Sequence, residues 1–216
     1  GYTGVYGFHG VHGRALALAA GLKAARPDLT VLVAGGDGDG LSIGGNHFIH
    51  ACRRNMDLTY IMMDNEVYGM TKGQASPTSA ADWAGGKMTP RGTGIRPFQP
   101  TALALNAGAS FIARGFTGDP NGLAKILVEA VQHRGFSFVQ ALSPCPTFRP
   151  EQMQWKRQVR SFGREATADP VEADRRLQSD DGFSTGIIFR HGYPVFQPGG
   201  FPDRGDLDAI EREFSI

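Results

Sequence analysis

Two short segments carry acidic and amide side chains whose types and spacing suit metal chemistry. The first is the run GGDGDG at 35–40, and the second is DNEVYGMTKGQ at 64–74. Asp37 and Asn65 stand 28 positions apart, 65 less 37, which is about the length of a strand–helix–strand crossover. A carboxylate, an amide oxygen and a carbonyl from the turn NEVYG at 65–69 are hard oxygen ligands. The spacing therefore predicts a Mg²⁺ site.

The glycines of the first segment favour a diphosphate beside that metal. Gly36, Gly38 and Gly40 would offer backbone N–H groups, and a helix expected to begin at Ser42 would add its positive N-terminus. Asp39 has two interpretations, a contact to the cofactor or a cap for that helix. The pattern predicts a site for a metal and a diphosphate together.

Other known motifs compete for the same residues. A dinucleotide fingerprint needs Gly where Leu41 or Ile43 stands, a calcium loop fails at Leu41 and Phe48, and no Walker A lysine follows. GLSIG at 40–44 does match the nucleophile elbow of serine hydrolases. That elbow turns directly off a strand, whereas the run GGDGD at 35–39 precedes its first glycine here. A non-catalytic interaction subunit is a further alternative, but it would be expected to lose Asp37 or Asn65.

The elements that must position these residues alternate along the chain. Apolar, β-branched runs predict strands buried on both faces, and Ala- and Leu-rich or capped segments predict helices between them. This alternation predicts an α/β fold, a parallel sheet with helices on both faces. The predicted strands are 29–35, 58–64, 109–115 and 136–142, and the predicted helices are 12–27, 42–55 and the segment from the Asp119 cap to Gly135.

Composition limits the domain count and the class of partner. A chain of 216 residues with 41% hydrophobic content predicts one core at 1–150, and the charged region 151–216 predicts a C-terminal extension with one extended piece at 186–196. That extension is expected to clamp onto a partner chain. The formal charge of +1, without a long run of like charges, indicates neither a nucleic-acid nor a membrane partner. Two distant cysteines and no signal-like segment predict a soluble cytoplasmic protein.

Three motifs in order resemble one known family. GDGDG, DNEVYGMTKGQ and LSPCPTF at 142–148 are similar to the beta subunit of the 2-oxoacid:ferredoxin oxidoreductases, especially the 2-oxoglutarate type, over roughly 1–150. The resemblance implies thiamine diphosphate and Mg²⁺ as cofactors. It also implies oxidative decarboxylation of 2-oxoglutarate to succinyl-CoA with coenzyme A, and electron transfer through a [4Fe-4S] cluster to ferredoxin. The implied partner is an alpha subunit, in an αβ or α2β2 assembly.

The resemblance also implies a role for individual residues. Asp37, Asn65 and the carbonyl of Val67 would hold Mg²⁺, and Cys145 would be a cluster ligand. Lys72 is expected to contact the distal carboxylate of the substrate, and His12 is expected to lie near the cofactor or to be a structural residue. The implied cofactor-binding residues are Gly36, Gly38, Asp39, Val67, Tyr68, Gly69 and Thr71.

The cysteines depart from the family pattern. Family members begin with a segment that carries a C-x-x-C pair and a third cysteine, and this chain is expected to start after it. Two cysteines cannot supply four thiolates, so the cluster is expected for the intact protein only. Cys52 is predicted to be a packed thiol on the apolar helix face with Phe48, and His47 and His50 to be surface or core residues. The aromatic rings predicted for the core are Phe111, Phe136 and Phe138.

Overall fold

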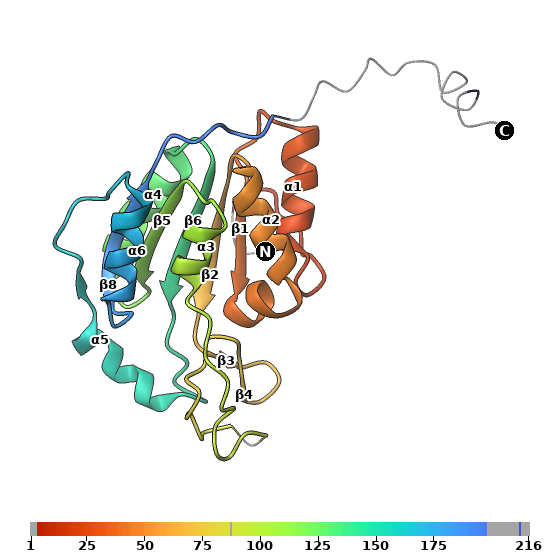
Figure 1. Ribbon diagram of the computed structural model, residues 1–216. Helices are drawn as coiled ribbons and strands as arrows, with labels where there is room; N and C mark the ends of the chain where they lie inside the picture. The colour runs from red at the N-terminus through yellow and green to blue at the C-terminus, as the bar shows by residue number, and fades with distance from the viewer. Residues whose placement is uncertain (1–3, 87, 198–211, 213–216) are drawn as a thin grey trace.

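A six-stranded, mostly parallel sheet forms the centre of the molecule (Figure 1). The computed structural model describes residues 4–86, 88–197 and 212. The strand order is β1-β2-β6-β5-β8-β7, and a separate two-stranded hairpin pairs β3 with β4. The strands are β1 (Leu32–Gly36), β2 (Leu58–Asp64), β3 (Val67–Tyr68), β4 (Gln74–Ala75), β5 (Phe111–Phe116), β6 (Phe136–Leu142), β7 (Arg160–Ser161) and β8 (Ser184–Arg190).

Parallel pairing brings the ends of β1, β2, β6 and β5 to one edge, as the sequence predicts. The predicted strands 58–64 and 136–142 match β2 and β6, while β1 and β5 begin two or three residues later than predicted. The prediction that the first strand is buried on both faces is wrong. β1 lies at the sheet edge, its burial alternates, and Leu32 is 53% exposed.

Helices cover both faces of the sheet, which confirms the predicted fold class. On one face, the rings of Phe48, Tyr60, Phe136 and Phe138 pack into the main core. On the other face, α4 packs Ala130 and its apolar neighbours into a second cluster. The helices are α1 (Ala15–Ala25), α2 (Gly45–Arg54), α3 (Pro100–Asn106), α4 (Pro120–Gln132), α5 (Trp155–Gln158) and α6 (Pro170–Gln178). None of these described helices is long and apolar enough to cross a membrane.

The chain after residue 150 joins the sheet. β8 pairs antiparallel with β5, and α6 lies against α3 (Figure 1). The predicted extended piece at 186–196 thus begins inside β8, whereas α3 and α6 have no counterpart among the predicted elements. The boundary at residue 150 stays a prediction, and residues 198–211 and 213–216 of the extension lie outside the described part of the chain.

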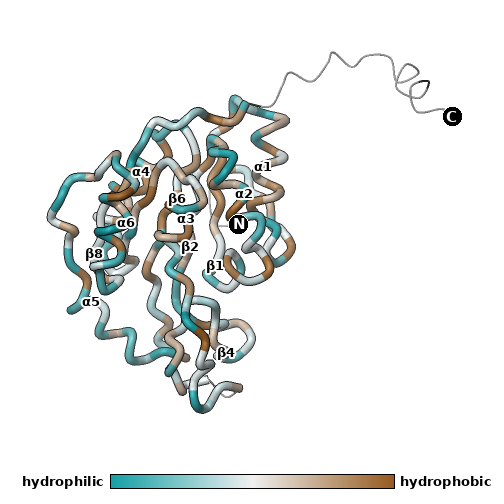
Figure 2. Tube along the Cα trace, viewed as in Figure 1, coloured by the Kyte–Doolittle hydropathy of each residue, from teal (hydrophilic) through white to brown (hydrophobic). Residues whose placement is uncertain are grey.

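The main core contains one buried hydroxyl that makes no hydrogen bond. Tyr60 is 1% exposed, and its Oη has no partner in the described structure. Because an unsatisfied buried hydroxyl costs about 1–3 kcal/mol, we expect Tyr60→Phe to raise the free energy of unfolding by about 1 kcal/mol. Chemical denaturation of both proteins measures this difference. A loss of stability would show that the hydroxyl has a partner in solution. In Figure 2 apolar residues appear in the strands and also in α1 and α4.

Candidate functional site

Asp37 and Asn65 meet at the carboxyl edge of the sheet, as their spacing predicts. Asp37 directly follows β1, and Asn65 directly follows the neighbouring strand β2. Gly36 pairs with Met63 in the parallel register, which places Asp37 and Asn65 just beyond neighbouring strand ends. Ligands of open parallel sheets bind at this edge.

The Asp37 carboxylate is buried and has only neutral partners. It is 2% exposed, and it accepts hydrogen bonds from the hydroxyls of Ser76 and Thr78, the latter at 2.7 Å. No Lys or Arg among the described residues forms an ion pair with it. Burial therefore raises the pKa of Asp37 despite the hydroxyl donors.

A second buried carboxylate lies beside the first. Thr78 Oγ1 lies 2.8 Å from Asp64 Oδ1, and the Gln140 amide donates to Asp64 Oδ2 at 2.7 Å. Burial and the Asp37 carboxylate raise the pKa of Asp64 to about 7. Thr78 has one hydroxyl proton but contacts both carboxylates, which fits a pair in which Asp37 and Asp64 share one further proton. We call this pair the acidic corner. Such a corner has the negative charge that a divalent cation would neutralise.

The oxygen ligands predicted for Mg²⁺ are close to this corner. Among the described residues, no group of three or more His, Cys, Asp or Glu is arranged to hold a metal. The predicted Mg²⁺ ligands are one carboxylate, one amide oxygen and one backbone carbonyl, so they would not form such a group. The Asn65 side-chain oxygen accepts from the Val67 N–H at 3.1 Å, and Glu66 between them has a φ of 54°. This turn fixes Asn65 relative to Val67.

The glycine run has a tighter geometry than predicted. Residues Asp39–Ile43 form a π-helical turn, and α2 begins at Gly45 with Gly44 as its N-cap, not at Ser42. A Cβ on Gly38 would lie 2.2 Å from Tyr68 Cε1, so glycine is required for this close approach. Tyr68 Oη donates to the Gly38 carbonyl at 3.4 Å. Two predicted cofactor-binding residues are therefore in contact.

Asp39 does not cap α2, so that interpretation is wrong. Asp39 Oδ1 accepts from the Gly13 N–H at 2.6 Å and lies 2.8 Å from His12 Nδ1. The physical reason is the π-helical turn, which delays the helix until Gly45. Asp39 instead ties the loop before α1 to the glycine run, and it brings His12 to the same edge.

The remaining predicted residues lie on the hairpin and the loop after β6. Thr71 and Lys72 are exposed, Thr71 Oγ1 donates to the Gln74 side chain at 2.5 Å, and Lys72 has a φ of 77°. The Cys145 sulfur lies 4.0 Å from the position that a Cβ on Gly69 would take. Cys145 therefore faces the hairpin that follows the Asn65 turn.

Two buried residues that were not predicted from the sequence, Gln152 and Arg149, connect the Asn65 turn to the loop after β6. Gln152, 1% exposed, donates to the Asn65 carbonyl at 2.9 Å and accepts from the Cys145 N–H at 2.9 Å. Arg149 pairs with Glu66 at 3.0 Å and lies 4.3 Å from the centre of the Trp83 ring. No sequence motif marks either residue, because each acts through contacts with distant segments.

The structure also places the residues of the alternative interpretations, namely Ser42, Cys52 and the two histidines of α2. Ser42 is exposed on the π-helical turn, and among the described residues it makes no hydrogen bond to a histidine, so the hydrolase geometry is not assembled. Cys52 is fully buried, and burial raises the pKa of its thiol, which confirms a packed cysteine. On α2, His47 is half-buried and His50 is exposed.

Comparison with known proteins identifies a family. The profile of the thiamine pyrophosphate enzyme, C-terminal TPP binding domain, matches residues 1–141. The 2-oxoglutarate oxidoreductase subunit KorB of Mycobacterium tuberculosis is 52% identical over 68% of this chain and 39% of its own length. The 2-oxoglutarate synthase subunit KorB of Archaeoglobus fulgidus is 52% identical over 64% of this chain and 52% of its own length. The chain thus spans about half of these relatives or less.

A solved structure extends the likeness to nearly the whole chain. It is the 2-oxoglutarate:ferredoxin oxidoreductase from Magnetococcus marinus with 2-oxoglutarate, coenzyme A and succinyl-CoA bound. The two chains are 37% identical with a TM-score of 0.82, over 94% of this chain and 68% of that one. The chain therefore belongs to the thiamine pyrophosphate enzymes, among the beta subunits of the 2-oxoacid:ferredoxin oxidoreductases.

Proposed function

We propose that this chain binds thiamine diphosphate through Mg²⁺ and serves a CoA-dependent oxidative decarboxylation of 2-oxoglutarate to succinyl-CoA. The observation that carries the proposal is the buried Asp37 carboxylate, which lies at the carboxyl edge without a cationic side chain in the described residues. The names of the relatives support the substrate and the reaction. An alpha subunit as partner and ferredoxin as electron acceptor belong to the same proposal.

In this proposal the chain's own residues hold and orient the cofactor. Asp37, Asn65 and the carbonyl of Val67 would be the Mg²⁺ ligands, with Ser76 and Thr78 fixing the carboxylate. Thiamine diphosphate, when bound, supplies the carbanion that attacks the 2-oxo carbon and the electron sink for loss of CO₂. The diphosphate would lie against Gly36, Gly38, Asp39, Val67, Tyr68, Gly69 and Thr71, with His12 near them through Asp39.

An iron–sulfur cluster does not fit the cysteines of this sequence. Such a cluster needs four thiolates, and of the two cysteines present Cys52 is buried in the core. Cys145 is half-buried in the loop after β6 and is the residue that would bind a cluster. Three further thiolates would have to come from outside these 216 residues, so no step of the mechanism is derived through the cluster.

Lys72 is proposed to select a substrate with a second carboxylate. It is exposed on the hairpin turn directly after Thr71, and an exposed charge pair contributes roughly 0.2–1 kcal/mol. We expect Lys72→Ala to lower kcat/KM for 2-oxoglutarate, relative to 2-oxobutyrate, by about two- to fivefold. Steady-state kinetics of the assembled enzyme with both substrates measures the ratio. A change below about twofold would exclude the contact.

Calorimetric titration tests the proposed function directly. Thiamine diphosphate is titrated into the intact protein, in the assembly in which it purifies, with and without Mg²⁺. We expect binding only with the metal, because the diphosphate and the acidic corner would otherwise repel each other. Absence of binding in both conditions would refute the proposal. Labelling of Ser42 by a fluorophosphonate would instead favour the hydrolase.

A further inference from the structure

A continuous row of buried polar side chains crosses the sheet from the loop before β8 to the site. We propose that Asp180, Arg114 and Gln140 are positioning residues that orient Asp64 and, through Thr78, the Asp37 carboxylate for its cation. The inference rests on the proposed function, since it concerns the same cation site. The row follows the strand order, with Asp180 before β8, Arg114 on β5, Gln140 on β6, Asp64 on β2 and Asp37 after β1.

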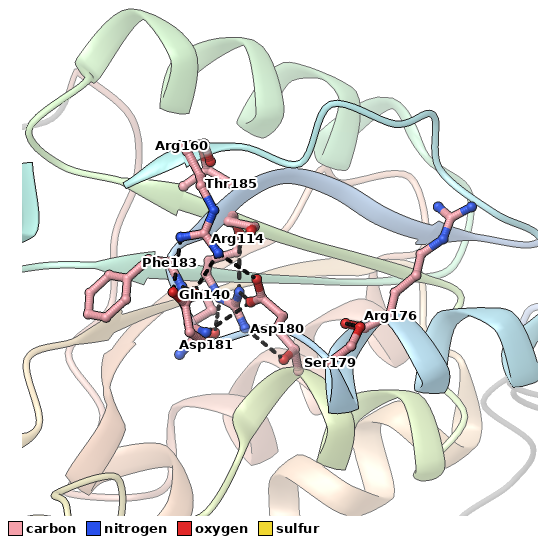
Figure 3. Close-up of polar contacts among 12 residues, drawn as sticks. Arg114, Gln140, Arg160, Arg176, Ser179, Asp180, Asp181, Phe183 and Thr185 are labelled. Atoms are coloured by element: carbon pink, nitrogen blue, oxygen red, sulfur yellow. Dashed lines mark hydrogen bonds and ion pairs between the residues drawn. The ribbon is translucent and has the colours of Figure 1, made fainter. Parts of the chain in front are cut away.

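The middle of the row is fixed by the strand register. Arg114 and Gln140 are direct partners in the parallel pair β5–β6, and Arg114 Nε donates to Gln140 Oε1 at 2.9 Å (Figure 3). This bond leaves the Gln140 NH₂ group to face β2, where it donates to Asp64 Oδ2 at 2.7 Å. A flipped amide would place two donors together on one side and two acceptors together on the other. The Arg114 guanidinium therefore determines which group Asp64 meets.

The outer end of the row is anchored by the loop that follows α6. Arg114 Nη1 pairs with the Asp180 carboxylate and donates to the Ser184 carbonyl at 3.1 Å. The side chains of Arg114 and Asp180 are 6% and 4% exposed, so water does not replace these bonds. The next residue, Asp181, is 58% exposed and pairs with the exposed Arg160 (Figure 3). The two neighbouring aspartates thus differ in burial and in partner, since Asp180 bonds Arg114 and Asp181 does not.

The inner end of the row reaches the proposed cation ligand. Because Gln140 holds Asp64 Oδ2, the other oxygen of Asp64 lies 2.8 Å from Thr78 Oγ1. The same Thr78 hydroxyl oxygen lies 2.7 Å from Asp37 Oδ2. A substitution at Asp180 is therefore expected to change the orientation of the Asp37 carboxylate, although the two residues are not in contact. The change would pass through the hydrogen bonds that orient the side chains between them.

A matched pair of variants tests this inference. Affinity for thiamine diphosphate at saturating and at limiting Mg²⁺, and the thermal midpoint without cofactor, are measured for Asp180→Asn and Asp181→Asn in the intact protein. We expect Asp180→Asn to weaken Mg²⁺-dependent binding by at least about threefold and Asp181→Asn to leave it unchanged. Arg114→Lys, which keeps the charge but loses the planar fork, should repeat the loss and serves if Asp180→Asn does not fold.

A double-mutant cycle separates positioning from general loosening. Gln140→Leu removes the amide that bonds both Arg114 and Asp64 and so interrupts the row, so adding Asp180→Asn should then cause little further loss of affinity. If Asp180→Asn caused its full loss of affinity in that background as well, Asp180 would act only through overall stability. Equal affinities of Asp180→Asn and Asp181→Asn would also overturn the inference. A wild-type protein that does not bind thiamine diphosphate would instead refute the proposed function.

Discussion

Replacing Asp37 by Asn is expected to weaken Mg²⁺-dependent binding of thiamine diphosphate by at least about 100-fold. Loss of an outer partner of a metal ligand alone costs about 10- to 100-fold, and Asp37 is the proposed charged ligand itself. Titration calorimetry in the presence of Mg²⁺ measures the change. Asp82→Asn is the matched control, because it removes the same charge from an exposed position and should bind like the wild type.

The stability of the same variant gives an independent readout. Burial raises the folded-state pKa of Asp37 above its unfolded value, so the native protein binds this proton more tightly. The carboxylate therefore costs stability, a cost that grows as pH rises from the unfolded pKa through the folded one. Without cofactor, Asp37→Asn should be at least as stable as the wild type at pH 8. Unaltered cofactor affinity in this variant would remove Asp37 from the site.

The carboxyl edge could be predicted because its signals are local. Asp37 and Asn65 each follow an apolar strand, and parallel strands one crossover apart place their ends side by side. The predicted cap of α4 is confirmed for the same reason, since the Asp119 side chain accepts from the Gly122 N–H at 3.0 Å. Strand β1 was misjudged because an edge strand and a central strand share the same apolar composition.

The supporting residues could not be predicted because their signals are tertiary. Ser76 and Thr78 lie in a loop whose sequence indicates only a turn, yet both donate to Asp37. Arg114 lies inside an apolar strand, and its buried charge is paired by Asp180, 66 positions later in the sequence. A single sequence contains no record of such pairings. The place of the proposed ligands at the carboxyl edge could thus be predicted from the sequence, while the residues that contact them could not.

The second large effect is expected at Arg149, in the loop after β6. Its guanidinium pairs with Glu66 Oε2 at 3.0 Å, donates to the Glu66 carbonyl at 3.0 Å and lies over Trp83. Burial raises the pKa of Glu66, and Arg149 opposes that shift. Removing one partner of a buried ion pair costs about 3–5 kcal/mol, so Arg149→Leu should lose about 3 kcal/mol of unfolding free energy, since Glu66 is only partly buried.

Arg149→Leu should also weaken cofactor binding, because Arg149 holds the turn that carries Asn65 and Val67. Chemical denaturation and calorimetry of the variant measure both losses, with Arg157→Leu on the exposed side of α5 as the matched control. Arg149→Lys should recover part of the stability through its charge but little of the affinity, because one ammonium cannot bond the Glu66 carboxylate and carbonyl in the same fork. If Lys restored both fully, charge alone would account for Arg149, and its geometry would have no role in the site.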